Sequence, residues 1–118
     1  MPVSVLIVDD HPAFRRSARD LLELDGFAVV GEAADGAAAV ELTRQLDPDL
    51  VLLDVALPDG NGFDVAERLA GSTSKVILIS SREQRDFGRR LVRCGALGFV
   101  MKDRLNAAAL YELLETAP

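Results

Sequence analysis

Hydrophobic residues in this 118-residue chain form two kinds of pattern, continuous runs and runs spaced three or four positions apart. The continuous runs predict strands buried on both faces, and the spaced runs predict amphipathic helices. Five strands are expected, at Ser4–Val8, Phe27–Gly31, Leu50–Leu53, Lys75–Ser80 and Leu97–Met101. Strands that alternate with helices are typical of a parallel α/β sheet, here in one domain over residues 1–118.

Five helices are expected between and after these strands. Pro12 suits the first turn of the first helix, and Gly26 suits its end. The other four are expected from Gly36 to the residue before Asp47, from Gly62 to Ala70, from Ser81 to Cys94, and after the capping residue Asn106. The chain is long enough to bury a hydrophobic core, and no repeat or linker interrupts it.

Polar and charged residues follow the predicted strands at the end where ligands collect in open parallel sheets. Asp54 ends the third strand and is followed by a Leu-Pro-Asp-Gly turn. Asp9 and Asp10 follow the first strand, Ser80 ends the fourth, and Lys102 follows the fifth. Three neighbouring carboxylates repel one another unless a cation lies between them, and oxygen ligands of this kind suit Mg²⁺. A carboxylate nucleophile, a divalent metal, an ammonium and a hydroxyl are the groups that phosphoryl transfer requires.

The motifs at these strand ends resemble the receiver domain of two-component response regulators. The matching segments are Asp9-Asp10, Leu52-Leu53-Asp54 with Leu57–Gly60 after it, Ile79-Ser80-Ser81, and Gly98–Lys102. The resemblance runs from about Val3 to the last helix, in order and in spacing. It implies a flavodoxin-like doubly wound fold, with five parallel strands in the order 2-1-3-4-5 and five helices.

The resemblance also implies a role for each residue of the site. Asp54 is expected to be the phosphoacceptor, and Lys102 its cationic contact. Mg²⁺ is expected to bind Asp9, Asp10, Asp54 and the backbone carbonyl of Ala56. Ser80 is expected to act as the switch hydroxyl, and Phe99 as the aromatic residue that turns inward on activation.

The chain departs from the common receiver pattern at three positions. Asp103 stands where a proline is common, Ser80 replaces the commoner threonine, and Phe99 replaces the commoner tyrosine. Phe99 carries no hydroxyl, so a partner contact through a tyrosine oxygen is not available. His11-Pro12 and Lys102-Asp103 look like the receivers that precede a helix-turn-helix output domain, which these residues do not contain.

The function implied is a phosphorylation-controlled switch rather than an enzyme acting on other molecules. The phosphodonor would be a sensor histidine kinase or a phosphotransfer protein, and the chain would catalyse only its own phosphorylation and dephosphorylation. Transcription would be regulated through an output domain absent from this chain. Self-association as a homodimer is a further hypothesis, suggested by a helical stripe of Arg82, Arg85, Arg89 and Arg93 that could meet Glu112 and Glu115 of a second copy.

Composition narrows these expectations further. The formal net charge of −6 argues against direct binding of nucleic acid by this domain. Cys94 is the one cysteine, so no internal disulfide can form, and a small core residue is the simplest interpretation of it. No signal peptide or membrane-spanning run is present, so a cytoplasmic location is expected, although an excised fragment would look the same.

Three alternatives stay open at this stage. An aspartyl-phosphate hydrolase of the haloacid dehalogenase kind needs a second aspartate two residues after the nucleophile, and Ala56 stands there. A flavodoxin-like cofactor module is disfavoured because Asp9 and Asp10 would repel phosphate. A receiver that signals without phosphate is also an alternative. Taken singly, the strand-end residues have ordinary structural explanations, Phe99 could be a simple core aromatic, and His11 is interpreted as a loop residue flanking the pocket.

Overall fold

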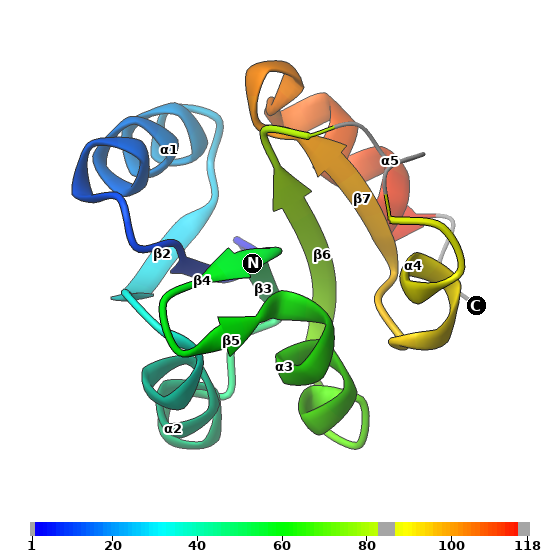
Figure 1. Cartoon of the computed structure of the whole chain (residues 1–118). Coiled ribbons are helices and arrows are strands. Elements are labelled where there is room, and N and C mark those ends of the chain that lie inside the picture. The colour runs from blue at the N-terminus through cyan, green and yellow to red at the C-terminus, as the bar shows by residue number, and fades with distance from the viewer. Residues whose placement is uncertain (1, 83–86, 116–118) are drawn as a thin grey trace.

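The computed structural model describes residues 2–82 and 87–115, and its centre is a five-stranded parallel sheet (Figure 1). The strands are β1 Ser4–Val8, β2 Ala28–Ala33, β3 Leu50–Asp54, β6 Lys75–Ser80 and β7 Gly98–Met101. They lie in the order β2-β1-β3-β6-β7. Counted along the chain without the short β4 and β5, this order is 2-1-3-4-5, so the predicted doubly wound topology is confirmed.

The three central strands are buried on both faces, as their continuous hydrophobic runs predicted. All five residues of β3 are buried, including Asp54 at its carboxyl end. Val8 at the end of β1 lies opposite Leu53, and Asp54 lies opposite Ile79 of β6. This register brings the carboxyl ends of β1, β3 and β6 to one edge of the sheet.

Helices cover both faces of the sheet (Figure 1). They are α1 Pro12–Leu24, α2 Gly36–Leu46, α3 Gly62–Leu69, α4 Arg90–Arg93 and α5 Ala107–Glu115. The side chains of α1 and α5 pack on one face, whereas those of α2, α3 and α4 pack on the other. None of the helices in the described part of the chain is long and apolar enough to cross a membrane.

Side-chain caps explain where three of these helices begin. The carboxylate of Asp35 accepts a hydrogen bond from the Ala38 N–H at 2.8 Å, and Asn61 caps α3 in the same way. Asn106 accepts from the Ala109 N–H at 2.8 Å at the start of α5. Each cap satisfies a backbone donor that has no partner within the helix, which confirms the predicted starts.

The sheet separates two hydrophobic clusters. One joins alternate strand residues such as Leu6 and Leu53 to Phe63 of α3 and to Cys94, which is buried as a small apolar residue. The other joins residues of the opposite pleat, such as Ile7, to α1 and α5. Burial on both sides of the sheet fixes the direction in which each strand-end side chain leaves it.

The structure corrects the helix expected over Ser81–Cys94. Among the described residues of that stretch, only the single turn α4 is helical, and Phe87–Arg89 form a turn before it. Residues 83–86 lie outside the description, and so does the Arg85 of the predicted arginine stripe. Four of the five expected helices therefore have two or more turns in the described chain.

Two small elements were not predicted, and one strand is longer than expected. The strand β2 continues to Ala33 because it stays paired with β1 to the end of that strand. Residues Ala56–Leu57 (β4) and Gly60–Asn61 (β5) form a short antiparallel hairpin in the loop after Asp54. A 3₁₀ turn, η2 Lys102–Arg104, follows β7.

Candidate functional site

Three strand ends supply the charged centre of the site. Asp9 follows β1, Asp54 ends β3, and Lys102 follows β7. Both carboxylates are buried, with residue exposures of 0% for Asp9 and 3% for Asp54. Buried charges on neighbouring strands need partners, and the sheet edge provides them.

Lys102 lies between the two buried carboxylates. Its Nζ is 2.5 Å from Asp9 Oδ2 and 3.2 Å from Asp54 Oδ2. The same ammonium lies 4.6 Å from the centre of the Phe14 ring on α1, a cation–π contact. A single lysine thus holds the ends of β1 and β3 together by charge.

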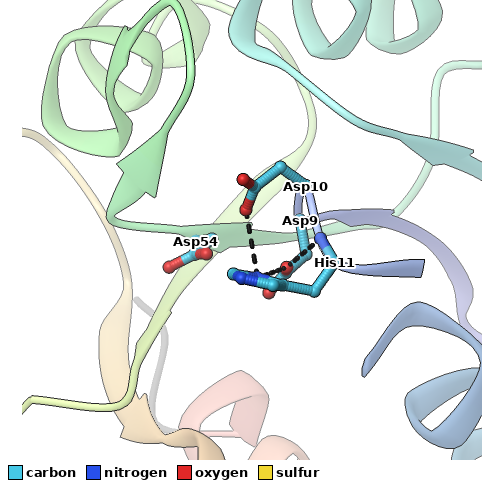
Figure 2. A group of neighbouring side chains, drawn as sticks. All are labelled: Asp9, Asp10, His11 and Asp54. Atoms are coloured by element: carbon cyan, nitrogen blue, oxygen red, sulfur yellow. Dashed lines mark hydrogen bonds and ion pairs between the residues drawn. The ribbon is translucent and has the colours of Figure 1, made fainter. Parts of the chain in front are cut away.

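Asp10 and His11 complete a group of four side chains that we call the acidic pocket: Asp9, Asp10, His11 and Asp54 (Figure 2). One ligand atom from each of the four lies within 4.8 Å of the others. The His11 ring lies against both neighbouring acids, with Nδ1 3.0 Å from Asp9 Oδ1 and 3.1 Å from Asp10 Oδ1. The backbone N–H of His11 also donates to Asp9 Oδ1 at 2.8 Å.

A second layer of polar contacts holds Asp9 in place. Arg15 donates from a terminal guanidinium nitrogen to the Asp9 carbonyl oxygen at 2.6 Å. Its Nε pairs with Glu32 of β2 at 3.0 Å, and Glu32 also pairs with Arg19 at 2.9 Å. The helix α1 is therefore tied to β1 and β2 next to the acidic pocket.

The pKa values of the two buried carboxylates shift in opposite directions. Burial by itself would raise the pKa of Asp9, but the Lys102 ammonium and the hydrogen bonds from His11 outweigh burial and lower it. Burial and the negative charge of Asp9 raise the pKa of Asp54, and the Ala56 N–H and Lys102 offset this only in part. The pKa of Lys102 is raised because the carboxylates of Asp9 and Asp54 outweigh its own burial.

The acidic pocket fits a divalent cation. Asp9 Oδ2 is fully buried, and the Lys102 ammonium, which it shares with Asp54, lies 2.5 Å from it. Burial and the neighbouring charge of Asp9 both raise the pKa of Asp54, and a bound cation would offset both effects. Carboxylate oxygens grouped at this spacing suit Mg²⁺, which binds through a few carboxylates and keeps several waters.

The predicted Mg²⁺ ligand at Ala56 lies in β4, directly beyond the acidic pocket. The Ala56 backbone N–H donates to Asp54 Oδ1 at 3.2 Å, which fixes the orientation of the Asp54 carboxylate. The methyl side chain of Ala56 is exposed and offers no acid or base, so the site lacks the second aspartate of a haloacid dehalogenase-type hydrolase.

Ser80 and Phe99 lie at the same edge but contact other groups. Ser80 is buried at the end of β6, and its Oγ accepts a hydrogen bond from the Arg82 N–H at 3.0 Å. Phe99 of β7 is partly buried, and its ring packs at 5.8 Å against Phe87. Their predicted switch roles stay predictions, because neither side chain has a hydrogen bond or ion pair to Asp54 within the described chain.

Two contacts of the site were not predicted from the sequence. His11 was interpreted as a loop residue flanking the pocket, and its position directly after the two acids could have indicated that its ring contacts them. Gly62 was expected only as the start of a helix, yet a Cβ there would lie 2.3 Å from the Asp54 carbonyl oxygen. The glycine is therefore required for close approach of α3 to the end of β3.

The fold and the pocket together define a doubly wound α/β protein with an acidic, lysine-bridged site at the switch point of its sheet. The family model described as response regulator receiver domain matches residues 5–115. The chain belongs to the receiver domain family of two-component response regulators, and the predicted family is confirmed.

Individual relatives agree with this assignment. The nitrate/nitrite response regulator protein NarP of Escherichia coli (strain K12) is 43% identical over 105 residues, which cover 86% of this chain and 49% of NarP. The transcriptional regulatory protein PdtaR of Mycobacterium tuberculosis (strain H37Rv) is 35% identical over 103 residues, covering 86% of this chain and 50% of PdtaR. This chain thus spans about half the length of the curated relatives it matches.

Solved structures show the same fold. The signal receiver domain of NarL from Mycobacterium tuberculosis superposes with a TM-score of 0.90 at 34% identity, covering 98% of both chains. A LuxR-family two-component response regulator from Aurantimonas sp. SI85-9A1 superposes with a TM-score of 0.85 at 30% identity, covering 98% of this chain and 84% of the other.

Proposed function

We propose that Asp54 accepts a phosphoryl group from a phosphohistidine donor and that the modification switches the output surface of the domain. The observation that carries this proposal is the position of Asp54, buried at the end of β3 with Lys102 Nζ 3.2 Å from its Oδ2. A carboxylate at this position can act as a nucleophile towards phosphorus. The Lys102 ammonium beside it can then stabilise the negative charge of the phosphoryl group during transfer.

Mg²⁺ is the cofactor proposed for this step. Asp9, Asp10, Asp54 and the backbone carbonyl of Ala56 would hold it, since the pocket fits a divalent cation on the grounds given above. When bound, the ion neutralises negative charge on the phosphoryl oxygens and lets the anionic donor approach three carboxylates.

Four residues of the chain have separate roles in the transfer and in the response to it. An Asp54 carboxylate oxygen attacks phosphorus while the bond to the donor imidazole nitrogen breaks, and the bonding electrons leave with the imidazole, which takes up a proton. Lys102 stays with the transferred group as a counter-charge. Ser80 leaves its Arg82 contact to donate to a phosphoryl oxygen, and Phe99 turns inward, which shifts a pre-existing conformational equilibrium.

Water would reset the switch by hydrolysing the acyl phosphate, and the chain would catalyse only its own phosphorylation and dephosphorylation. The phosphodonor would be a sensor histidine kinase or a phosphotransfer protein, in the cytoplasm. By analogy with relatives named as response regulators and transcriptional regulators, the switch would control transcription through an output domain, and the receiver itself would not bind nucleic acid.

Intact mass spectrometry tests the proposal directly. The chain is incubated with acetyl phosphate with and without Mg²⁺, beside Asp54→Asn and, as a matched control, the exposed Asp20→Asn of α1. We expect a gain of one phosphoryl group that needs Mg²⁺, persists in Asp20→Asn and is absent from Asp54→Asn. No gain in the unmodified chain, repeated with a phosphorylated kinase as donor, would refute the assignment of Asp54.

A further inference from the structure

We propose that His11 is itself a metal ligand and that it gives the acidic pocket a preference for first-row transition-metal ions such as Co²⁺, Ni²⁺ or Zn²⁺ over Mg²⁺. The inference rests on the proposed metal site, which it extends by one nitrogen donor. The ligands would be His11 Nδ1 and the Oδ1 atoms of Asp9 and Asp10, with Asp54 at the edge of the same group.

The spacing of these three atoms is that of ligands sharing one ion. His11 Nδ1 is 3.0 Å from Asp9 Oδ1 and 3.1 Å from Asp10 Oδ1 (Figure 2). Two adjacent ligands in an octahedral site with bonds of about 2.1 Å are separated by about 3.0 Å. One ion placed against the face of these three donors can therefore reach all of them with little movement of the side chains.

The carboxylate at the centre of this face belongs to Asp9. This residue is 0% exposed, and its Oδ2 lies 2.5 Å from Lys102 Nζ. Lys102 lies on the Oδ2 side of Asp9, whereas the His11 ring, which also contacts Asp10, lies on the Oδ1 side. The two positive partners of Asp9 would thus occupy opposite oxygens, the ammonium on one and the metal on the other.

The His11 ring is available as a ligand because it does not cap α1 and contacts only the acids of the pocket in the described chain. His11 occupies the N-cap position of α1 but makes no side-chain cap, and its side chain is 69% exposed. Its backbone N–H, bonded to Asp9 Oδ1, anchors the residue whatever the ring does. Without a metal, Nδ1–H can only donate to the two acids, and a metal ion replaces that proton.

The nitrogen donor determines which ions are favoured. Mg²⁺ prefers oxygen ligands and gains little from imidazole, whereas affinity for imidazole rises from Mn²⁺ towards Ni²⁺ and Cu²⁺. The chain contains one histidine, and its single cysteine, Cys94, is buried in the core, so His11 is the one imidazole that can contribute.

Metal binding measured on the untagged chain tests the inference. Calorimetric titrations with Co²⁺ and with Mg²⁺ are compared for the unmodified chain, His11→Ala and Asp10→Asn. We expect His11→Ala to weaken Co²⁺ binding by about tenfold or more and to weaken Mg²⁺ binding far less, because only Co²⁺ gains strongly from the imidazole nitrogen and loss of a direct ligand costs at least as much as loss of an outer-shell partner. Asp10→Asn should weaken binding of both ions.

A second measurement needs no variant. Paramagnetic Co²⁺ should broaden the ring proton resonances of the one histidine, and excess Mg²⁺ should restore them by competing for the same pocket. Equal Co²⁺ affinity in the unmodified chain and in His11→Ala, ring resonances that Co²⁺ leaves sharp, or broadening that Mg²⁺ does not reverse would each overturn the inference. Neither measurement involves phosphorylation, so failure of the Asp54 proposal would show in the mass experiment alone.

Discussion

Asp9 and Asp54 are neighbours in the same buried site, yet their environments favour the charged form of Asp9 and disfavour that of Asp54. Asp9 faces Lys102 and two donors from His11, so its pKa falls and its charge is favoured. Asp54 is buried against the charge of Asp9, so its pKa rises and its charge is disfavoured. In the metal-free domain the proposed phosphoacceptor therefore carries the unfavourable charge of the pair, as is typical of functional residues.

Removing the Asp54 charge should stabilise the metal-free domain. We expect Asp54→Asn to increase the free energy of unfolding at pH 7 by about 1 kcal/mol, because the amide keeps the shape of the side chain without a buried charge and without the repulsion from Asp9. A raised folded pKa contributes stability that is present below the unfolded pKa and lost as the pH rises through the folded pKa. The gain should therefore be absent at pH 3 and appear as Asp54 ionises in the unmodified chain.

Urea unfolding of both proteins across this pH range, with chelator present, measures the difference. Lys102→Met made in both backgrounds is the control, since it should cost the unmodified chain more stability than the Asp54→Asn variant. A variant less stable than the unmodified chain at pH 7 would contradict the account of Asp54 as an unfavourably buried charge.

At the scale of elements, the site depends on how closely α3 approaches the end of β3. The Gly62 N–H donates to the Val55 carbonyl at 2.7 Å, and Phe63 beside it packs into the core. This contact fixes the backbone next to Asp54, and the hydrogen bond from the Ala56 N–H fixes the Asp54 side chain.

A methyl group at Gly62 should disturb this junction. Its Cβ would lie 2.3 Å from Asp54 O and 3.0 Å from Val55 Cα, both backbone atoms of a buried strand end. We expect Gly62→Ala to lower the free energy of unfolding by about 2 kcal/mol and to slow phosphorylation by acetyl phosphate. Gly71→Ala is the matched control, because a Cβ there meets nothing within 4 Å. Equal effects of the two substitutions on the free energy of unfolding would contradict this expectation, because α3 could then move away from β3 without loss of stability.

The same scale shows which features could be predicted from sequence. Strand ends and caps such as Asp35 are local signals, and the parallel-sheet rule alone brought Asp9, Asp54 and Lys102 to one edge. The β4–β5 hairpin was not predicted, because strands of two residues are too short to show a periodic pattern of hydrophobic residues. The contact of the His11 ring with the acids depends on side-chain geometry, and the approach of Gly62 depends on packing between elements, so neither has a sequence pattern of its own.

At the scale of the whole molecule, charge is distributed unevenly around the edge strand β7. The helices α4 and α5 flank this strand on opposite faces of the sheet. Arg89 and Arg93, at α4, are exposed, and so are Glu112 and Glu115 of α5. A two-fold axis through this edge would place the arginines of each copy against the glutamates of the other, which is the arrangement that the homodimer hypothesis requires.

Charge reversal tests that arrangement. We expect the chain treated with Mg²⁺ and acetyl phosphate to sediment as a dimer, and Arg89→Glu with Arg93→Glu to weaken the association at least about tenfold, because like charges would then face each other. Adding Glu112→Lys and Glu115→Lys should restore it, since the pairing is re-formed with its signs exchanged, and high salt should weaken both forms. Arg44→Glu on α2, which packs against β1 and β2 and not at the β7 edge, is the control for reversing one exposed arginine elsewhere. Dimers that survive the double arginine reversal, or a monomer under all conditions, would exclude this surface, leaving the receiver to signal through contacts with a different partner.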